Sequence, residues 1–466
     1  MYQVVGIKVL GKVLGAPGDQ DHQGLPVEGA AETLDKEVER LQALTSKLQA
    51  LVKAGLDLQT ALSLLRVYAG PASQYTLSSC QVSEASAAHY DAVLAESWSK
   101  LLGRNISSDE PRLWLPARMG GCGASSARAR MAAAPWASWT ASLDDVMSHM
   151  VVQGVEELFE QAPAVADEIG RLHAMLIRQG TLPSITHASV AQAIAIKRPQ
   201  RALVAHVHKC SLRTLRSGLD NAQAGFLRAA SGTAAVGFLE PPLDDRWVMT
   251  NRRSSIATLK RLNVAFPMRA CLPATQPTCP NTTAQGQVCG KLCDDLGLHL
   301  ENCAPADGLI ARHDGIVRCL GVLGARALDP RPKLEQVIPE LARPVQGQIG
   351  QARLDVILHD GASRSLVDVV VVSPYSTNAA FTAACARRDG HASRRAAIAK
   401  RARYPTADLV PFALETGGRI GPDARALLIK MADAAEEPVK ELQHLYRAIS
   451  SMLQDGVARQ LEKICD

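Results

Sequence analysis

Residues 351–361 read Gln-Ala-Arg-Leu-Asp-Val-Ile-Leu-His-Asp-Gly, and residues 365–374 read Ser-Leu-Val-Asp-Val-Val-Val-Val-Ser-Pro. Both runs are rich in Val, Ile and Leu, which suit the pleated surface of a sheet. Asp360-Gly361 between them is a strong signal for a tight hairpin turn. The sequence therefore predicts two neighbouring antiparallel strands.

Each of these strands carries one aspartate, Asp355 or Asp368. A loop at 360–361 sets Asp355 opposite Leu366 and diagonal to Asp368, whereas a four-residue loop at 360–363 sets the two aspartates directly opposite. Because side chains alternate along a strand, both carboxylates leave the same face of the sheet in either register. They are then expected to lie within roughly 5–8 Å of each other.

Two carboxylates this close in an apolar strand environment repel each other unless positive charge separates them. A hard divalent cation such as Mg²⁺ or Mn²⁺ prefers oxygen ligands and meets that need. Such a metal also polarises a phosphodiester and generates hydroxide. The pattern thus predicts a catalytic metal held by Asp355 and Asp368. The other interpretation is that each aspartate is merely exposed at the sheet edge.

Further charged residues surround the predicted pair. Upstream, Glu335 and Glu340 offer a third carboxylate, and a helix start carries Arg312-His313-Asp314. Downstream, a basic helix holds Arg387, Arg388, His391, Arg394, Arg395, Lys400, Arg401 and Arg403. A helix of this kind can contact backbone phosphates, with Lys400 near the scissile group. The competing interpretation is a charged face that is simply solvated.

Helices and strands alternate in the C-terminal half of the chain. The expected order is helix, three strands, helix and strand, at residues 308–326, 334–341, 352–359, 365–373, 379–403 and 408–415. Two further helices follow. This order describes a compact α/β domain.

The N-terminal half is expected to be mainly α-helical. Apolar residues recur at helical spacing from 31 to 68, which predicts one or two amphipathic helices broken near Gly55, with the apolar stripe in the core. With 47% hydrophobic residues, 21% charged residues and a net charge of +5, the chain is not expected to be disordered. No apolar run approaches the roughly 18 residues of a membrane span, and the start lacks the pattern of a signal peptide.

Five of the eleven cysteines lie between residues 271 and 303. The tightest set, Cys289-x3-Cys293-x5-His299-x3-Cys303, has the residue types that bind Zn²⁺ in a tetrahedron. Four protein ligands leave no open position, so the predicted zinc is structural. Cys271 and Cys279 are spare, and Cys279 can take the place of Cys289. Buried cysteines beside a surface histidine are the alternative.

Together these motifs resemble the C-terminal part of the reverse transcriptase polyprotein of non-LTR retrotransposons, in the lineage with a restriction-enzyme-like endonuclease. The motifs follow the order of that family along nearly the whole chain. They are Gly6-Ile-Lys-Val-Leu-Gly11, Val13-Leu-Gly-Ala-Pro17, Ala61-Leu-Ser-Leu-Leu-Arg66, Pro71-x3-Tyr75, Leu115-Pro116-x3-Gly120-Gly121-x-Gly123, the Cys-Cys-His-Cys set, Arg312-His313, Asp355 with Asp368, Lys400, Tyr404, and Glu415-Thr-Gly-Gly418.

The resemblance implies five segments. They are a thumb-like remnant at 1–110, a helical linker at 111–265, a CCHC zinc knuckle at 266–305, a restriction-enzyme-like endonuclease at 306–436 and a C-terminal helix at 437–466. It also implies that fingers and palm are missing, because the chain begins where the palm should end. No reverse transcriptase activity is therefore expected from this chain.

The endonuclease of that family has the PD-(D/E)xK fold. Twelve residues separate Asp355 from Asp368, as the family pattern requires. Leu354 stands where the family has proline, and Val370 stands where it has lysine, so the lysine role passes to Lys400 on the following helix.

Two functions follow as expectations. The first is a DNA endonuclease that uses Mg²⁺ or Mn²⁺, with Asp355 and Asp368 as metal ligands, Glu335 completing the metal's shell and Lys400 orienting water or stabilising charge. The second is a degenerate remnant that binds nucleic acid without cutting it. In both, DNA and element RNA are the expected partners, a nuclear location is implied by the resemblance, and no membrane is involved. The residues expected to contact nucleic acid are Arg312, His313, Arg394, Arg395, Arg401 and Arg403.

Overall fold

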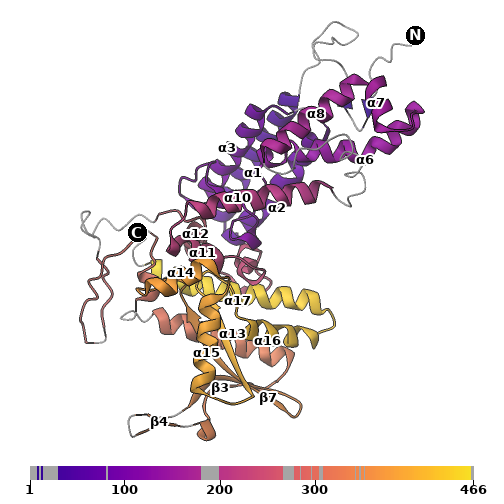
Figure 1. Cartoon of the computed structure of the whole chain (residues 1–466). Helices are drawn as coiled ribbons and strands as arrows, with labels where there is room; N and C mark the ends of the chain where they lie inside the picture. Colours follow the sequence, from indigo (N-terminus) through magenta and orange to yellow (C-terminus); the bar gives the residue numbers. More distant parts are fainter. Residues whose placement is uncertain are drawn as a thin grey trace. The chain divides into compact units, whose positions relative to one another are not determined.

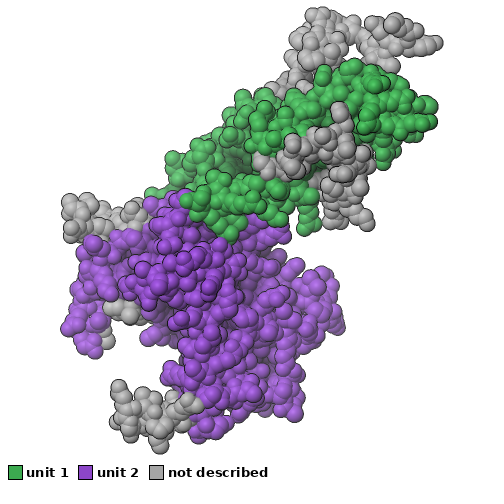
Figure 2. Space-filling model, viewed as in Figure 1, with its two compact units in different colours: residues 1–51, 64–114, 124–217 green, residues 52–63, 115–123, 218–466 purple. Residues whose placement is uncertain are grey.

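Two compact units make up the molecule (Figure 2). The computed structural model describes residues 8–9, 12–13, 30–79, 82–179, 199–265, 278–283, 285–294, 296–303, 308–341, 343–345, 348–350 and 352–462. Unit 1 comprises Met1–Leu51, Leu64–Trp114 and Ala124–Ser217, and unit 2 comprises Val52–Ser63, Leu115–Gly123 and Gly218–Asp466. None of the described helices is long and apolar enough to cross a membrane.

Unit 1 is built of helices, with one two-residue strand pair among its described residues. Its elements are β1 (Lys8–Val9), β2 (Lys12–Val13), α1 (Ala30–Lys53), α2 (Leu58–Ser79), α3 (Glu84–Leu102), α4 (Pro111–Trp114), α5 (Ala127–Arg130), α6 (Ala133–Met150), α7 (Val155–Gln161), α8 (Pro163–Arg178) and α10 (Pro199–Ser217). Residues 52–53 of α1 and 58–63 of α2 belong to unit 2. The mainly helical N-terminal half predicted from the sequence is confirmed (Figure 1).

The apolar stripe of the first helix is core, as its spacing predicts. Leu34, Leu41 and Leu48 recur every seven residues, about two turns, on α1, and all three are buried. The helical pattern breaks at Gly55, whose φ of +113° a residue with a side chain adopts only with strain. A second core joins α6, α7 and α8.

Unit 2 combines one sheet with helices. Its elements are η1 (Ala117–Met119), α11 (Asn221–Ala229), η2 (Ala234–Leu239), η3 (Asp245–Trp247), α12 (Asn251–Leu262), η4 (Leu300–Asn302), α13 (Gly308–Ala327), β3 (Lys333–Val337), η5 (Pro339–Leu341), β4 (Arg343–Val345), β5 (Gln348–Gly350), β6 (Arg353–Asp360), β7 (Ser363–Val372), α14 (Ala379–Arg387), α15 (His391–Arg403), β8 (Leu409–Glu415), α16 (Pro422–Asp433) and α17 (Pro438–Glu462). The helices α13, α16 and α17 pack together (Figure 1).

The sheet is mixed and has the strand order β3-β6-β7-β8. β3 pairs with β6, and β6 with β7, in antiparallel fashion, whereas β7 and β8 are parallel. A parallel pair needs a crossover connection, and α14 with α15 supplies it. The predicted order of helix, three strands, helix and strand is present in this sheet, with an unpredicted short strand pair, β4 and β5, inserted between β3 and β6. The expected single helix at 379–403 is two helices, because the chain turns at Gly390 with a φ of +67°.

The hairpin register matches the second of the two predicted alternatives. His359 pairs with Arg364, and Asp360 with Ser363, so the connecting turn is shorter than the four-residue loop considered from the sequence. Gly361 has a φ of +58° in this turn, where glycine is favoured. Continued beyond the last paired residues, the register sets Asp355 opposite Asp368.

The helix α13 lies very close to the sheet. A Cβ atom at Gly324 would come within 2.5 Å of Cδ2 of Leu358 on β6, and one at Gly321 within 2.9 Å of Cδ2 of Leu334 on β3. Carbon atoms in contact are normally about 3.5–4.0 Å apart, so only glycine permits this approach. This packing leaves the start of α13 beside Asp355.

Candidate functional site

The carboxylate of Asp368 forms the centre of the first candidate site. It is 3% exposed in the middle of β7, and Nζ of Lys400 on α15 donates to its Oδ1 over 2.6 Å. Lys400 therefore comes from the crossover helix, as the sequence predicts. The other oxygen, Oδ2, is buried and has no hydrogen-bond partner among the described residues.

Asp355 lies on the neighbouring strand and is held by two groups. The amide of Val369 donates to its Oδ2 over 2.6 Å, and Nε2 of His313 lies 3.2 Å from the same oxygen. The other ring nitrogen of His313, Nδ1, lies 3.1 Å from Oδ1 of Asp314. The hydrogen bond with Asp355 raises the pKa of His313 to about 9 against the opposing effect of burial, so the ring is a cation at neutral pH.

The two aspartates are shifted in opposite directions. Burial raises the pKa of Asp368, and the nearby Asp355 adds to this rise, while Lys400 opposes it. Burial also acts upward on the pKa of Asp355, but His313, the amide of Val369 and Lys400 outweigh it, and the net shift is downward. Such divergence is expected of a carboxylate pair when desolvation dominates at one carboxyl group and cationic and amide partners dominate at the other.

The residues present fit a hard divalent cation. Mg²⁺ and Mn²⁺ take oxygen ligands, and Mg²⁺ is commonly held by one or two carboxylates with water completing its shell. Oδ2 of Asp368 is an acceptor with no protein donor among the described residues, and His313 and the amide of Val369 both contact Oδ2 of Asp355. A buried acceptor left in this way is costly unless an ion or water meets it.

Glu335 lies across from Asp355 on the edge strand β3, between the pairs Leu334 with Val356 and Gln336 with Leu354. Its carboxylate contacts the guanidinium of Arg353. Its φ is +52°, which interrupts the ladder at this position. Glu335 therefore lies on the strand next to Asp355, but its carboxylate pairs with Arg353.

The residues predicted to contact nucleic acid separate into two groups. Arg312 is 4% exposed, and its Nη1 donates to the carbonyl of Glu301 and to Oε1 of Gln460 over 3.1 and 3.0 Å. Arg312 is therefore an interior residue, and its burial does not fit the prediction that it contacts nucleic acid at the surface. His313 contacts Asp355 and so belongs to the carboxylate centre.

The arginines of α15 are at the surface. Those predicted to contact phosphates are all exposed, namely Arg394, Arg395, Arg401 and Arg403. The start of this helix is fixed by Glu415 at the end of β8, whose Oε1 accepts from the amide and hydroxyl of Ser393 over 3.0 and 3.1 Å. Burial raises the pKa of Glu415 despite these bonds. Glu415 belongs to the Glu415-Thr-Gly-Gly418 motif quoted from the sequence, but its supporting role at the start of α15 was not predicted.

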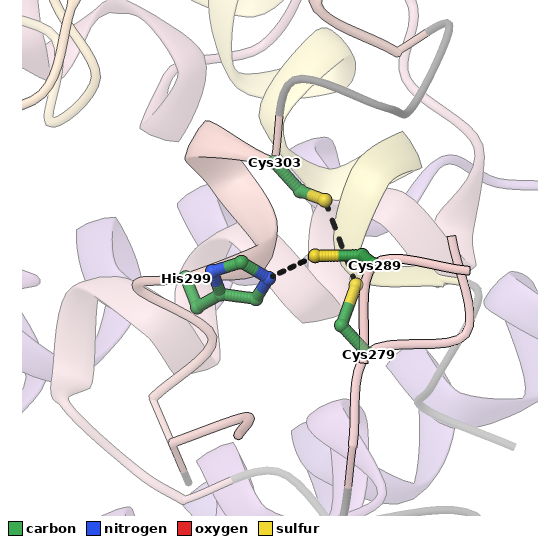
Figure 3. A group of neighbouring side chains, drawn as sticks. All are labelled: Cys279, Cys289, His299 and Cys303. Atoms are coloured by element: carbon green, nitrogen blue, oxygen red, sulfur yellow. Dashed lines mark hydrogen bonds between the residues drawn. The ribbon is translucent and has the colours of Figure 1, made fainter. Parts of the chain in front are cut away.

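A second candidate site is a cluster of three cysteines and one histidine (Figure 3). Ligand atoms of Cys279, Cys289, His299 and Cys303 all lie within 4.8 Å of one another. The sulfurs of Cys279 and Cys303 are 3.5 Å apart, as are the sulfur of Cys289 and Nε2 of His299. Sulfurs bound to one tetrahedral zinc are roughly 3.8 Å apart, so the group can hold a metal such as zinc.

This cluster corrects the predicted ligand set, because Cys279 replaces Cys293 in it. The cause is a hairpin at 278–292, in which the amide of Cys289 donates to the carbonyl of Asn281, and that of Cys279 to Lys291. The pairing brings Cys279 alongside Cys289. Cys293 is not one of the four, although its buried thiol lies close enough to interact with Cys279. Cys271 lies outside the described residues.

A local turn capped by Asp294 determines the position of His299. The carboxylate of Asp294 accepts from the amides of Leu296, Leu298 and His299 over 3.1, 2.9 and 2.9 Å. This cap starts the turn that continues as η4, so that His299 and Cys303 point to the same side. The sequence predicted this pair correctly from its spacing.

No protein-family model and no curated protein matches the chain. The geometry of the two centres therefore carries the functional argument.

Proposed function

We propose that this protein is a DNA endonuclease that depends on a divalent metal and has a restriction-enzyme-like centre at Asp355, Asp368 and Lys400. The observation that carries the proposal is the buried Asp368, which holds the ammonium of Lys400 at 2.6 Å on one oxygen and has no described protein donor on the other. A purely structural ion pair needs no second carboxylate beside it.

The chain's own groups have distinct tasks in this proposal. Asp355 and Asp368 hold Mg²⁺ or Mn²⁺, which when bound activates water and neutralises charge on the phosphodiester. Lys400 presents an ammonium group where negative charge develops. His313 and the amide of Val369 fix the orientation of Asp355. The exposed arginines of α15 contact backbone phosphates without reading bases.

The order of motifs supports a retroelement origin for the proposed enzyme. On that proposal the Cys3His centre at 279–303 is a structural zinc knuckle that takes part in nucleic-acid binding, and DNA and element RNA are the partners in the nucleus. The five segments predicted from the resemblance, and the absence of polymerase activity in this chain, stay predictions.

A plasmid-nicking assay with Mg²⁺ or Mn²⁺ tests the proposal. Asp368→Asn should reduce nicking by at least about a hundredfold, with DNA affinity equal or higher, because repulsion of the phosphates is relieved. Asp360→Asn is the matched control, since Asp360 is an exposed aspartate at the end of β6 that pairs with Lys430 at the surface. Normal cutting by Asp368→Asn would refute the assignment.

The second candidate function is a nucleic-acid-binding remnant without catalysis. It is favoured by the ion pairs of the centre, because Lys400 and His313 already compensate Asp368 and Asp355 without a metal. DNA binding in a fluorescence-anisotropy titration, with no metal-dependent nicking at any pH tested, would support this alternative.

A further inference from the structure

Glu301 lies inside the cysteine and histidine segment, on the single turn η4 between His299 and Cys303. Its exposure is 0%. Glutamate is rarely buried to this extent, and a buried carboxylate persists only where cations and donors surround it. The partners of the Glu301 carboxylate therefore show which other elements contact this turn.

Three side chains from outside the segment converge on this carboxylate. Nζ of Lys260 on α12 lies 2.7 Å from Oε2, and the Lys260 side chain is itself only 3% exposed. The hydroxyls of Ser373 and Thr416 donate to Oε1 over 2.9 and 3.1 Å. One side chain thus ties the turn to three other parts of unit 2.

Two of these partners lie at the ends of the two parallel strands. Ser373 directly follows β7, the strand of Asp368, and Thr416 directly follows β8. The amide of Thr416 donates to the carbonyl of Val372 over 2.9 Å. Glu301 therefore holds both strand ends at the point where they are joined to each other.

A second connection leads from the same residue to the other aspartate. The backbone carbonyl of Glu301 accepts from Nη1 of the buried Arg312 over 3.1 Å. Arg312 directly precedes His313, whose ring lies 3.2 Å from Asp355. Both aspartates are thus supported by elements that Glu301 contacts.

We propose that Glu301 is a positioning residue that couples metal occupancy of the Cys3His centre to the geometry of the Asp355–Asp368 centre. Metal binding fixes the turn between His299 and Cys303, and the carboxylate of Glu301 then holds the end of β7. Without the metal, the backbone that carries Glu301 is no longer fixed at both ends. Coupling of this kind is reciprocal between the two sites. The inference rests on the proposed carboxylate metal centre.

The test measures Mn²⁺ affinity directly, from the electron paramagnetic resonance signal of unbound Mn²⁺, with no cleavage step. The full chain is compared in its zinc-loaded form and after zinc removal and dialysis. The variants are Glu301→Gln, and Ser373→Ala, which deletes one hydroxyl and keeps the ion pair with Lys260. Glu437→Gln is the control, because it breaks a surface ion pair with Lys440. Asp368→Asn defines the binding that belongs to the carboxylate centre.

In the wild-type chain, zinc loading should raise Mn²⁺ affinity by a factor of about 5 or more, the lower end of typical coupling between sites. The factor should persist in Glu437→Gln and fall below about 2 in Glu301→Gln and Ser373→Ala. Equal factors in all chains, or no effect of zinc in the wild type, would overturn the coupling alone. Mn²⁺ binding that Asp368→Asn leaves unchanged would overturn the carboxylate centre and the coupling with it. If Glu301→Gln does not fold, Ser373→Ala decides the outcome.

Discussion

Lys400 and Asp368 are 32 residues apart in sequence and 2.6 Å apart in the structure. The lysine is on α15, and the strand position two residues after Asp368 holds Val370. A lysine on the helix reaches the carboxylate from the side of the crossover. A lysine on α15 can therefore occupy the same place beside Asp368 as a lysine two residues further along the strand would.

Replacing Lys400 with methionine should lower the nicking rate by about a hundredfold, the usual effect of removing one charge-stabilising group. The pH profile should move as well. Lys400 lowers the pKa of Asp368 against the effect of burial, so its loss raises that pKa further and a proton competes better with the metal. The acidic limb of the rate profile should shift to higher pH.

The matched control for this experiment is Lys430→Met, which removes a partly exposed lysine that pairs with Asp360 at 3.0 Å. Its rate and pH profile should equal those of the wild type. An unshifted acidic limb in Lys400→Met would show that Lys400 does not act on Asp368.

His313 predicts how stability depends on pH in the absence of divalent cations. Its pKa is raised to about 9 in the folded protein, so its contribution is fully present below the unfolded value of about 6.5 and is lost as the pH rises through about 9. The pKa of Asp355 is lowered, so the pair also weakens when Asp355 takes up a proton in acid.

Urea unfolding at a series of pH values checks this prediction. The difference in unfolding free energy between wild type and His313→Gln should be largest near pH 6, at most about 3 kcal/mol, and should vanish above about pH 9. His149→Gln, an exposed histidine of unit 1, should show no such difference. A gap between His313→Gln and wild type that persists at pH 10 would contradict the ion pair.

At the scale of elements, two hairpins show what the sequence can and cannot reveal. The hairpin of β6 and β7 is predictable because long apolar runs flank Asp360-Gly361, and the shared carboxylate face follows from strand periodicity, whereas the sequence left two registers open. The hairpin at 278–292 has few apolar residues and short pairing, so nothing in the sequence shows that Cys279 faces Cys289. Close spacing favours Cys293 instead, and the structure does not place it in the group.

The sequence also did not predict which buried charged residues hold the elements of the two sites in place. Glu301 and Glu415 are isolated acids whose partners come from distant segments, and Arg312 resembles a surface cation beside His313. Burial of a charged side chain depends on the packing of whole elements, which sequence periodicity does not specify. The placement of Asp355 and Asp368 on neighbouring strands was predictable, and the acids that hold their supporting elements were not.

Glu415 provides a prediction at this scale. Glu415→Ala removes the acceptor for the amide and hydroxyl of Ser393 at the start of α15, which should cost about 1–3 kcal/mol for buried donors left unpaired. The amides of α15 should exchange faster with deuterium, and nicking should fall because Lys400 is less well placed. Glu436→Ala, at an exposed site beyond α16, is the control. Unchanged exchange in α15 would contradict the role of Glu415.

At the scale of the whole molecule, the two units are interleaved along the chain. Unit 2 takes in Val52–Ser63 and Leu115–Gly123 in addition to its C-terminal part. Arg261 on α12 shows how tightly one of these segments is held. Its guanidinium is buried and donates to the carbonyl of Gly121 over 2.7 Å, and it also contacts the carbonyl of Ala117.

A fragment that starts at residue 218 should therefore be less stable than the full chain. It keeps the carbonyl of Ala235 as an acceptor for Arg261 but lacks those of Gly121 and Ala117, and buried donors left unpaired cost about 1–3 kcal/mol. The zinc-loaded fragment should unfold at a lower temperature than unit 2 does in the full chain, as measured by calorimetry. Adding residues 115–123 as a peptide should recover part of the loss. Equal stability of fragment and full chain would show that these segments are dispensable.

Oδ2 of the buried Asp368 has no hydrogen-bond partner among the described residues, and this has an evolutionary consequence. A desolvated charge pair gives little net stability, and a well-packed apolar pair in its place is often more stable by about 1–4 kcal/mol. Asp368→Leu combined with Lys400→Met should then raise the melting temperature while ending nicking. If the double variant is instead less stable, the fold itself requires the pair. A gain in stability would mean that random drift under selection for folding alone erases this centre, so that only selection for cleavage retains it.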